Sequence, residues 1–218
     1  MRDYKIDKNE VLRYLGHKTQ NIDEDLDNKI NTLLKHCLEI SKPQYIYAFF
    51  DVETLDSGIK LKNTNLLFRG NDIFNHLKGA EKCGIIAATL GAQTEKEIIL
   101  LEKRSMTDAI IFDSACSSLI ENVVSRCEEE MISIVQKEGK FANYRYSPGY
   151  GDFPIETQKD LISVLNAEKR IGLTVTDSFL MIPRKSVTAV FGVFSEEKCD
   201  NQKGCEACSF NKDCKVRK

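Results

Sequence analysis

The chain lacks several features that would assign it at once to a familiar class of protein. Its first residues, MRDYKIDKNEVLRYL, contain no apolar run of the kind found in signal peptides. No segment approaches the roughly 18 consecutive apolar residues that a membrane-spanning helix needs. The formal net charge is only −2, so there is no polyelectrolyte signature of nucleic-acid binding. These absences predict a cytoplasmic protein that binds neither membranes nor nucleic acids.

Two nucleotide-binding signatures are also missing. There is no G-x-G-x-x-G at a junction between a predicted strand and a predicted helix, which argues against the common Rossmann-type methyltransferase. There is no P-loop either. The three histidines, His17, His36 and His76, occur singly, and we assign them no role because a single histidine is usually a surface or core residue.

The spacing of apolar residues predicts an α+β domain. Steps of three and four residues between Ile22 and Ile40 indicate an amphipathic helix that ends before Pro43, and the same spacing indicates a long helix over 107–137. Runs rich in β-branched, aromatic and other apolar residues predict strands at 45–53, 81–91 and 186–194.

Four smaller elements are expected between these. They are a short strand at 58–63, a short helix at 70–79, a helix begun by a Thr94–Glu97 capping box, and a helix over 155–172 that ends at Gly172. There is no internal repeat and no low-complexity linker before about Ser195. We therefore expect one domain over 1–195 and a cysteine-rich tail over 196–218.

The eight cysteines fall into two groups. Cys37, Cys83, Cys116 and Cys127 lie in apolar segments and are typical of small buried side chains. The tail spaces the other four as C-x5-C-x2-C-x5-C, and they are Cys199, Cys205, Cys208 and Cys214. Four thiolates can close a tetrahedral zinc site or hold an iron–sulfur cluster, although the outer gaps match neither a zinc ribbon nor a bacterial ferredoxin closely. Free or redox-active thiols are the alternative.

The stretch YRYSPGYGDFP, residues 144–154, is unusually stiff and aromatic. Arg145 offers a planar fork of donors that suits a carboxylate. Pro148 fixes the backbone, Gly149 lets it approach a ligand closely, and Tyr150 offers a flat face beside a polar tip. The set suits an amino acid-like ligand with an aromatic or cationic portion, but a plain turn explains the same residues. Tyr144 and Tyr146 are expected to pack around the loop.

From this loop to Ser195 the chain resembles the activation (reactivation) domain of cobalamin-dependent methionine synthase. The shared elements are an R-x-x-P-G-Y loop with a later proline, a helix leading to a glycine, and an L-T-x-x-S-F-x-M-x-P-x-x-S-V segment at 173–187. The preceding DSACSSLIENVV is similar to the long helix of that family. The resemblance extends over residues 1–195 and implies the fold of that domain, with a mostly antiparallel sheet flanked by helices.

The resemblance also implies a site for S-adenosylmethionine. By that likeness Arg145 holds the methionine carboxylate, and backbone groups from Ser147 through Pro148 to Gly149 meet the adenosine with Tyr150 stacked nearby. Glu121 is the counterpart of the family's helix glutamate that pairs with the α-ammonium. The family's N-terminal acidic ligand has no counterpart that we can assign. The run Glu128–Glu130 is expected to be a solvated helix face and is left out of the site.

The implied activity is methyl transfer from S-adenosylmethionine to cobalt during reductive reactivation, as part of methionine biosynthesis. A sulfonium methyl is a strong electrophile and reduced cobalamin a strong nucleophile, so no general base is needed and we assign no catalytic residue. Nothing in the chain looks like a cobalamin-binding module. The chain is therefore expected to act in trans on a cobalamin-binding methionine synthase, with a separate flavodoxin or ferredoxin as electron donor. Reductive activation of another corrinoid protein and a non-catalytic, metal-binding interaction module are the alternatives.

Overall fold

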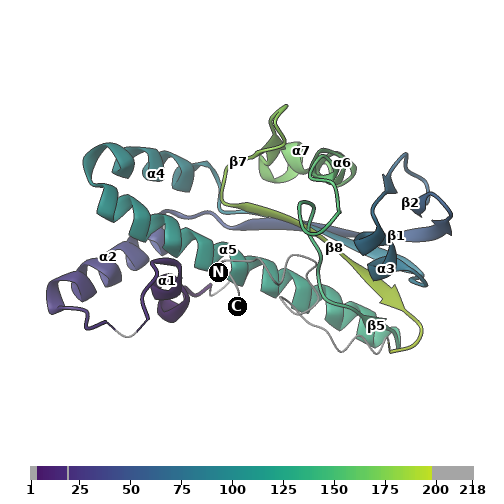
Figure 1. Ribbon diagram of the computed structural model, residues 1–218, viewed down its shortest axis with the longest axis horizontal. Coiled ribbons are helices and arrows are strands. Elements are labelled where there is room, and N and C mark those ends of the chain that lie inside the picture. The colour runs from purple at the N-terminus through teal and green to yellow at the C-terminus, as the bar shows by residue number, and fades with distance from the viewer. Residues whose placement is uncertain (1–3, 19, 198–218) are drawn as a thin grey trace. The chain divides into compact units, whose positions relative to one another are not determined.

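A computed structural model describes residues 4–18 and 20–197 (Figure 1). The helices are α1 (Lys8–Tyr14), α2 (Glu24–Ile40), α3 (Asn71–Leu77), α4 (Ala92–Arg104), α5 (Met106–Lys137), α6 (Thr157–Val164) and α7 (Ala167–Ile171). The strands are β1 (Gln44–Leu55), β2 (Gly58–Leu61), β3 (Leu67–Phe68), β4 (Lys82–Thr89), β5 (Phe141–Ala142), β6 (Thr174–Val175), β7 (Met181–Ile182) and β8 (Ser186–Phe194). The fold is α+β, with a mostly antiparallel sheet and flanking helices, as predicted.

Six strands form one sheet in the order β3-β2-β1-β4-β8-β5. β1 pairs antiparallel with β2, β2 with β3, and β5 with β8. The two remaining strands, β6 and β7, form a separate antiparallel hairpin. Among the residues described, no helix is long and apolar enough to cross a membrane.

The longer helices and strands confirm the predictions made from the spacing of apolar residues. α2, α5, β1, β4 and β8 lie where apolar spacing predicted them, and β2 and α3 confirm the shorter predictions. Helix α1 was not among the predicted elements, and its signal in the sequence is Asp7. The Asp7 carboxylate accepts hydrogen bonds from the backbone N–H groups of Asn9 and Glu10, which begins the helix.

The predicted capping role of Thr94 is wrong. α4 begins two residues earlier, at Ala92, after Gly91 in a left-handed conformation with φ 86°. A capping hydroxyl accepts from a backbone N–H, whereas the buried Thr94 hydroxyl donates to the carbonyl of Gly91 at 2.7 Å. Glu97 is occupied elsewhere, since His36 Nε2 lies 3.1 Å from its Oε1.

The single helix predicted over 155–172 is two helices. α6 ends at Val164 and α7 begins at Ala167, with Asn166 between them at φ 53°. Asparagine adopts this left-handed conformation more readily than most residues, so it ends α6 without a glycine. The predicted end at Gly172 is confirmed, because Gly172 follows α7 at φ 66° and its N–H donates to the carbonyl of Glu168.

The chain divides into two compact units. Unit 1 comprises Met1–Ile46, Ala88–Arg126 and Ala167–Val187, and unit 2 comprises Tyr47–Ala87, Cys127–Asn166 and Thr188–Lys218. Each unit is built from three segments that are distant in sequence. No single point along the chain separates the two units.

Unit 1 is built around the apolar faces of its helices. α2 buries Ile30, Leu33 and Cys37. These pack in one cluster with residues of α5 that recur at helical spacing, including Phe112, Cys116, Leu119 and Val123.

Unit 2 is rich in aromatic contacts. Phe191 of β8 meets Phe49 of β1 edge to face, with ring centroids 6.1 Å apart. A Cβ at Gly84 would lie 2.5 Å from the Phe191 ring. Glycine is therefore required within β4 to make room for this ring.

Candidate functional site

The loop over 144–154 is anchored to strand β8 of unit 2 by Tyr146. The Tyr146 N–H donates to the Val190 carbonyl at 2.7 Å, and the Val190 N–H donates back at 2.8 Å. The Tyr146 ring stacks on Phe153 with centroids 6.2 Å apart and an interplanar angle of 21°. Since Phe153 is itself buried, the aromatic residues hold the two arms of the loop together.

The tip of the loop is a tight turn that depends on glycine. The Gly149 N–H donates to the Phe153 carbonyl at 2.8 Å, and the Phe153 N–H donates to the Tyr150 carbonyl at 3.0 Å. Gly149 has φ 91° and Gly151 has φ 52°, both in the region that L-residues rarely adopt. The loop is thus a turn with an internal hydrogen-bond network.

The far end of the loop is fixed by an aspartate that the sequence analysis did not single out. The Asp152 carboxylate accepts from the backbone N–H groups of Asn71 at 2.6 Å and Asp72 at 2.9 Å, at the start of α3. In return the Asp152 N–H donates to the Asp72 carboxylate at 3.1 Å. This reciprocal arrangement caps α3 from 80 residues away in sequence.

A buried histidine lies beneath the loop. His76 is 5% exposed, and its ring centroid lies 4.6 Å from that of Tyr144 and 5.2 Å from that of Tyr146. Asn143 donates through its side chain to the His76 carbonyl at 2.8 Å and accepts from the Gly192 N–H at 2.7 Å. The expectation that Tyr144 and Tyr146 pack around the loop is confirmed.

Arg145 is held by Glu128, which corrects the prediction of a solvated face for that residue, whereas Glu129 and Glu130 are exposed as predicted. One oxygen of the Glu128 carboxylate forms an ion pair with Arg145 Nη1, and the other accepts from the Arg145 backbone N–H at 3.3 Å. The Glu128 side chain is only 16% exposed and that of Arg145 25%. Glu130 also makes a contact, because its carboxylate accepts from the Tyr47 hydroxyl at 2.9 Å.

The remaining predicted residues of the loop differ in exposure. Pro148 is buried, Ser147 is half-buried, and Gly149 is exposed. Tyr150 is 62% exposed, with its ring centroid 6.4 Å from that of Tyr146. The structure thus places Arg145 and the residues from Ser147 to Tyr150 together on one anchored loop of unit 2.

Glu121, the last predicted ligand residue, belongs to unit 1. It lies half-buried on α5. Burial raises the pKa of Tyr14, and the nearby charge of Glu121 raises that pKa further. Glu121 and the loop therefore belong to different units.

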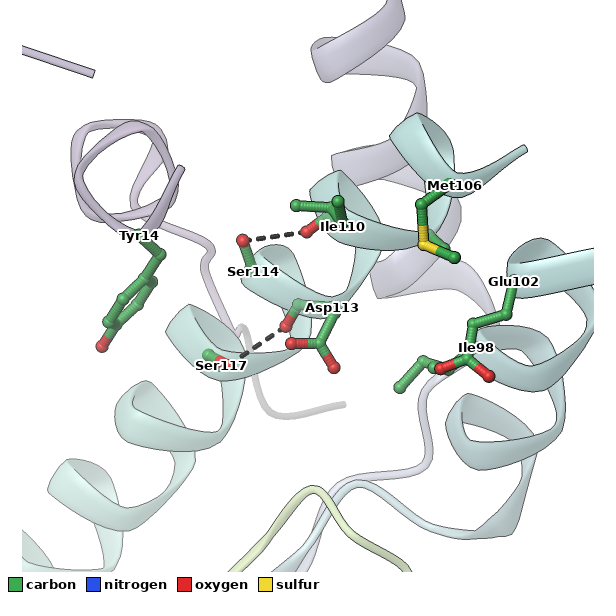
Figure 2. Close-up of a pocket in the computed structure, with 9 residues that line it drawn as sticks. Tyr14, Ile98, Glu102, Met106, Ile110, Asp113, Ser114 and Ser117 are labelled. Atoms are coloured by element: carbon green, nitrogen blue, oxygen red, sulfur yellow. Dashed lines mark hydrogen bonds between the residues drawn. The ribbon is translucent and has the colours of Figure 1, made fainter. Parts of the chain in front are cut away.

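Unit 1 contains a pocket of about 390 Å³ (Figure 2). Its walls combine apolar and polar side chains from three helices, namely Tyr14, Ile98, Glu102, Met106, Ala109, Ile110, Asp113, Ser114 and Ser117. None of the predicted ligand residues lines this pocket.

The predicted metal site cannot be compared with the structure, because Cys199, Cys205, Cys208 and Cys214 lie outside the described residues. Within 4–18 and 20–197, no group of three or more His, Cys, Asp or Glu side chains is placed to hold a metal ion.

The sequence and the fold both have known relatives. Residues 82–201, more than half of the chain, match the family described as vitamin B12-dependent methionine synthase, activation domain. Among solved structures, the chain is similar to a MetH reactivation domain bound to AdoHcy, with a TM-score of 0.65 and 15% identity. That alignment covers 88% of this chain and 75% of the other. At this identity the likeness shows the fold alone.

A second structure adds no argument. A nitroreductase family protein from Streptococcus pneumoniae TIGR4 aligns over 86% of this chain and 88% of its own at 11% identity, but with a TM-score of 0.34. No curated protein matches the chain.

Proposed function

Because the chain belongs to the activation-domain family of vitamin B12-dependent methionine synthases, we propose that it binds S-adenosylmethionine on the 144–154 loop and delivers its methyl group to a corrinoid. The family match is the observation that carries this proposal. It is supported by the relative of the same fold that was crystallised with AdoHcy, the compound left when S-adenosylmethionine gives up its methyl group.

The residues of the loop fit such a ligand. A guanidinium carries five N–H donors, so Arg145 can bind Glu128 and a ligand carboxylate together. The Tyr150 ring is exposed enough to lie against an adenine or beside a sulfonium. Backbone groups from Ser147 to Gly149 lie on the same anchored turn and provide polar contacts for the nucleoside. Glu121 is the proposed partner of the α-ammonium.

The chemistry makes modest demands on these residues. The sulfonium methyl is the electrophile, and the reduced corrinoid of a partner supplies the electron pair that takes it. The proposed work of this chain is to bind the methyl donor, orient it and exclude water, so that a bimolecular reaction gains the advantage of positioning. Anchoring of the loop at Tyr146 and Asp152 serves that purpose, because a loop that is already ordered loses little entropy when it binds.

The proposed partner is a cobalamin-binding methionine synthase that the chain serves in trans, and another corrinoid methyltransferase is the alternative. A flavodoxin or ferredoxin is the proposed electron donor. We further propose that the domain over 1–195 carries the site and that the tail cysteines hold zinc or an iron–sulfur cluster.

Calorimetric titration with S-adenosylmethionine tests the proposal. Arg145→Lys keeps a positive charge opposite Glu128 but loses the planar fork, so the variant should bind more weakly by about 1.5–3 kcal/mol. Arg69→Lys makes the same substitution at an exposed position of unit 2 and should leave the affinity unchanged. Absence of saturable binding by the parent at millimolar ligand, with and without a corrinoid protein, would sink the proposal.

A further inference from the structure

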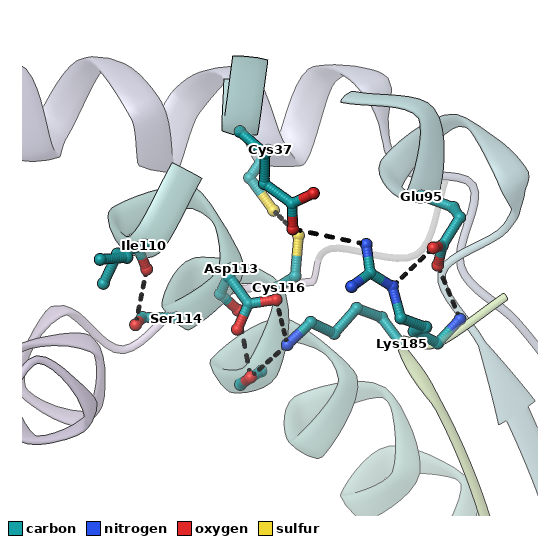
Figure 3. A network of polar contacts seen from close by, with 10 residues as sticks. Cys37, Glu95, Ile110, Asp113, Ser114, Cys116 and Lys185 are labelled. Atoms are coloured by element: carbon teal, nitrogen blue, oxygen red, sulfur yellow. Dashed lines mark hydrogen bonds and ion pairs between the residues drawn. The ribbon is translucent and has the colours of Figure 1, made fainter. Parts of the chain in front are cut away.

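Two of the cysteines in unit 1 lie side by side. Cys37 of α2 and Cys116 of α5 are both fully buried, and their sulfurs are 3.5 Å apart (Figure 3). The other two described cysteines, Cys83 and Cys127, belong to unit 2. A buried cysteine alone behaves as an inert apolar side chain, but two adjacent thiols are chemically different because an oxidant can join them as a disulfide.

Polar and cationic groups lie near this cysteine pair, unlike the environment of a cysteine in an ordinary apolar core. The Ser41 hydroxyl lies 3.8 Å from the Cys37 sulfur. The side chain of Lys185 is largely buried, and its ammonium contacts Asp113 Oδ1 and Ser117 Oγ at 2.8 Å each (Figure 3). These two contacts flank Cys116 on the same helix, which directs a positive charge toward the thiols.

The local environment shifts the pKa values of the two thiols in opposite directions. The contact with Cys116 lowers the pKa of Cys37, and the Ser41 hydroxyl and the Lys185 charge lower it further against the effect of burial. The contact with Cys37 and burial both raise the pKa of Cys116. Cys37 is therefore the better nucleophile of the pair and Cys116 the thiol that resolves the product.

We propose that Cys37 and Cys116 are a redox-active dithiol that closes to a reversible disulfide, cross-linking α2 to α5 within unit 1. A disulfide needs its sulfurs at about 2.05 Å, so they must approach by about 1.5 Å from their present 3.5 Å. Rotation of two side chains can supply such a movement, and no other described thiol of this unit competes. This inference is independent of the proposed binding of S-adenosylmethionine.

The reaction balances with a peroxide as the oxidant. The Cys37 thiolate attacks one oxygen of hydrogen peroxide, so the S–O bond forms, the O–O bond breaks, and hydroxide leaves to take up the thiol proton as water. The Cys116 thiol then attacks the Cys37 sulfur, which forms the S–S bond and releases a second water. The two thiols lose two electrons, and peroxide is reduced to two waters. Because both sulfurs are buried, we expect the reaction to wait for local opening of unit 1 and to be slow.

Peptide mapping of the folded full chain tests the proposal. The reduced protein is treated with hydrogen peroxide, quenched, unfolded, alkylated and digested. We expect a peptide that joins Cys37 to Cys116 to increase at least tenfold over the untreated protein and to disappear after dithiothreitol. Cys83, which is equally buried but lies in unit 2 with its thiol near the Gly84 carbonyl, should be recovered as an alkylated thiol. Mapping identifies the tail cysteines separately.

Two outcomes would overturn the proposal. One is recovery of Cys37 and Cys116 as separate thiols from the folded protein while the same peroxide links them in the urea-unfolded chain. The other is linkage of either residue to a different cysteine in the folded protein. A Cys116→Ala variant should yield no linked peptide containing Cys37, and if that variant fails to fold, the map of the parent protein decides alone.

Discussion

Arg145, the proposed ligand of the methionine carboxylate, is held in one orientation without any ligand. A long cationic side chain loses considerable rotamer entropy when it is fixed. Because the ion pair with Glu128 already fixes Arg145 in the folded protein, this entropy is lost during folding and not during ligand binding. The pair is mostly shielded from solvent, which makes its contacts stronger than those of a surface ion pair. Any ligand carboxylate at this position then meets a guanidinium whose orientation is already defined.

Gly151 provides a test at the residue scale of how tightly the loop is built. A Cβ here would clash with Asp72 Oδ2 and lie 2.5 Å from the Tyr146 hydroxyl, whereas a Cβ at Gly139 would meet nothing within 4 Å. Both glycines have positive φ, so alanine at either position carries a similar backbone strain of about 1 kcal/mol. We expect Gly151→Ala to lose a further ~1–3 kcal/mol of unfolding free energy through overpacking.

Urea unfolding followed by far-ultraviolet circular dichroism measures that difference. Gly139→Ala serves as the matched control, since it has the strained conformation without the close contacts. Equal stability of the two variants would mean that the loop moves aside freely, and the description of a rigid turn would be wrong.

At the scale of single elements, α3 depends on a cap that lies far away in sequence. Its own N-cap residue is Gly70, which has no side chain to accept a hydrogen bond. Asp152 supplies the missing acceptor to the N–H groups of Asn71 and Asp72. We expect Asp152→Ala to destabilise the protein by about 1–2 kcal/mol, the range for loss of a helix cap.

The matched control for this prediction is Glu156→Ala. Glu156 stands at the N-cap position of α6 and makes no side-chain cap hydrogen bond, so its removal should change the unfolding free energy little. Hydrogen exchange adds a local readout, because the backbone amides of α3 should lose protection in Asp152→Ala alone. A loss of protection that is as large in the control would contradict the assigned role.

The elements that sequence predicted best are those whose signal lies in their own residues. α2 and α5 repeat apolar residues at helical spacing over many turns, and β8 is a run of β-branched and aromatic residues. The break between α6 and α7 was missed because apolar residues continue on both sides of Asn166 and only its left-handed conformation ends the helix. Thr94 matched a cap pattern, but burial of its side chain placed it inside α4.

The same distinction between local and long-range signals applies to the candidate site. The loop was recognisable because its prolines, glycines and tyrosines are adjacent in sequence. Glu128 lies 17 residues from Arg145, and Asp152 lies 80 residues from Asp72, so their contacts depend on tertiary structure that no local pattern encodes. The run of charges that includes Glu128 favours a solvated helix face. The ion pair with Arg145 explains why the Glu128 side chain is mostly buried.

At the scale of the whole molecule, the proposed function depends on a second protein. In that proposal this chain supplies the methyl donor, and a partner protein carries the corrinoid that accepts the methyl group. We therefore expect methylation of a corrinoid protein only when this chain, S-adenosylmethionine and a low-potential reductant are all present. Transfer should fall at least tenfold with Arg145→Lys and remain unchanged with Arg69→Lys, because only the first alters the proposed ligand contact.

The measurement is transfer of labelled methyl from S-adenosylmethionine to the corrinoid, monitored together with its absorbance spectrum. A methionine synthase fragment with its cobalamin module but without its own activation domain is the first partner, and other corrinoid methyltransferases are compared with it. Preference for one of the latter would leave the proposed binding site unchanged and alter only the identity of the partner.

A chain with all four tail cysteines replaced by serine separates the roles of the two proposed regions. Full activity of that variant would assign methyl transfer to residues 1–195, whereas loss of transfer with binding retained would point to the tail as part of the partner contact or of the electron path.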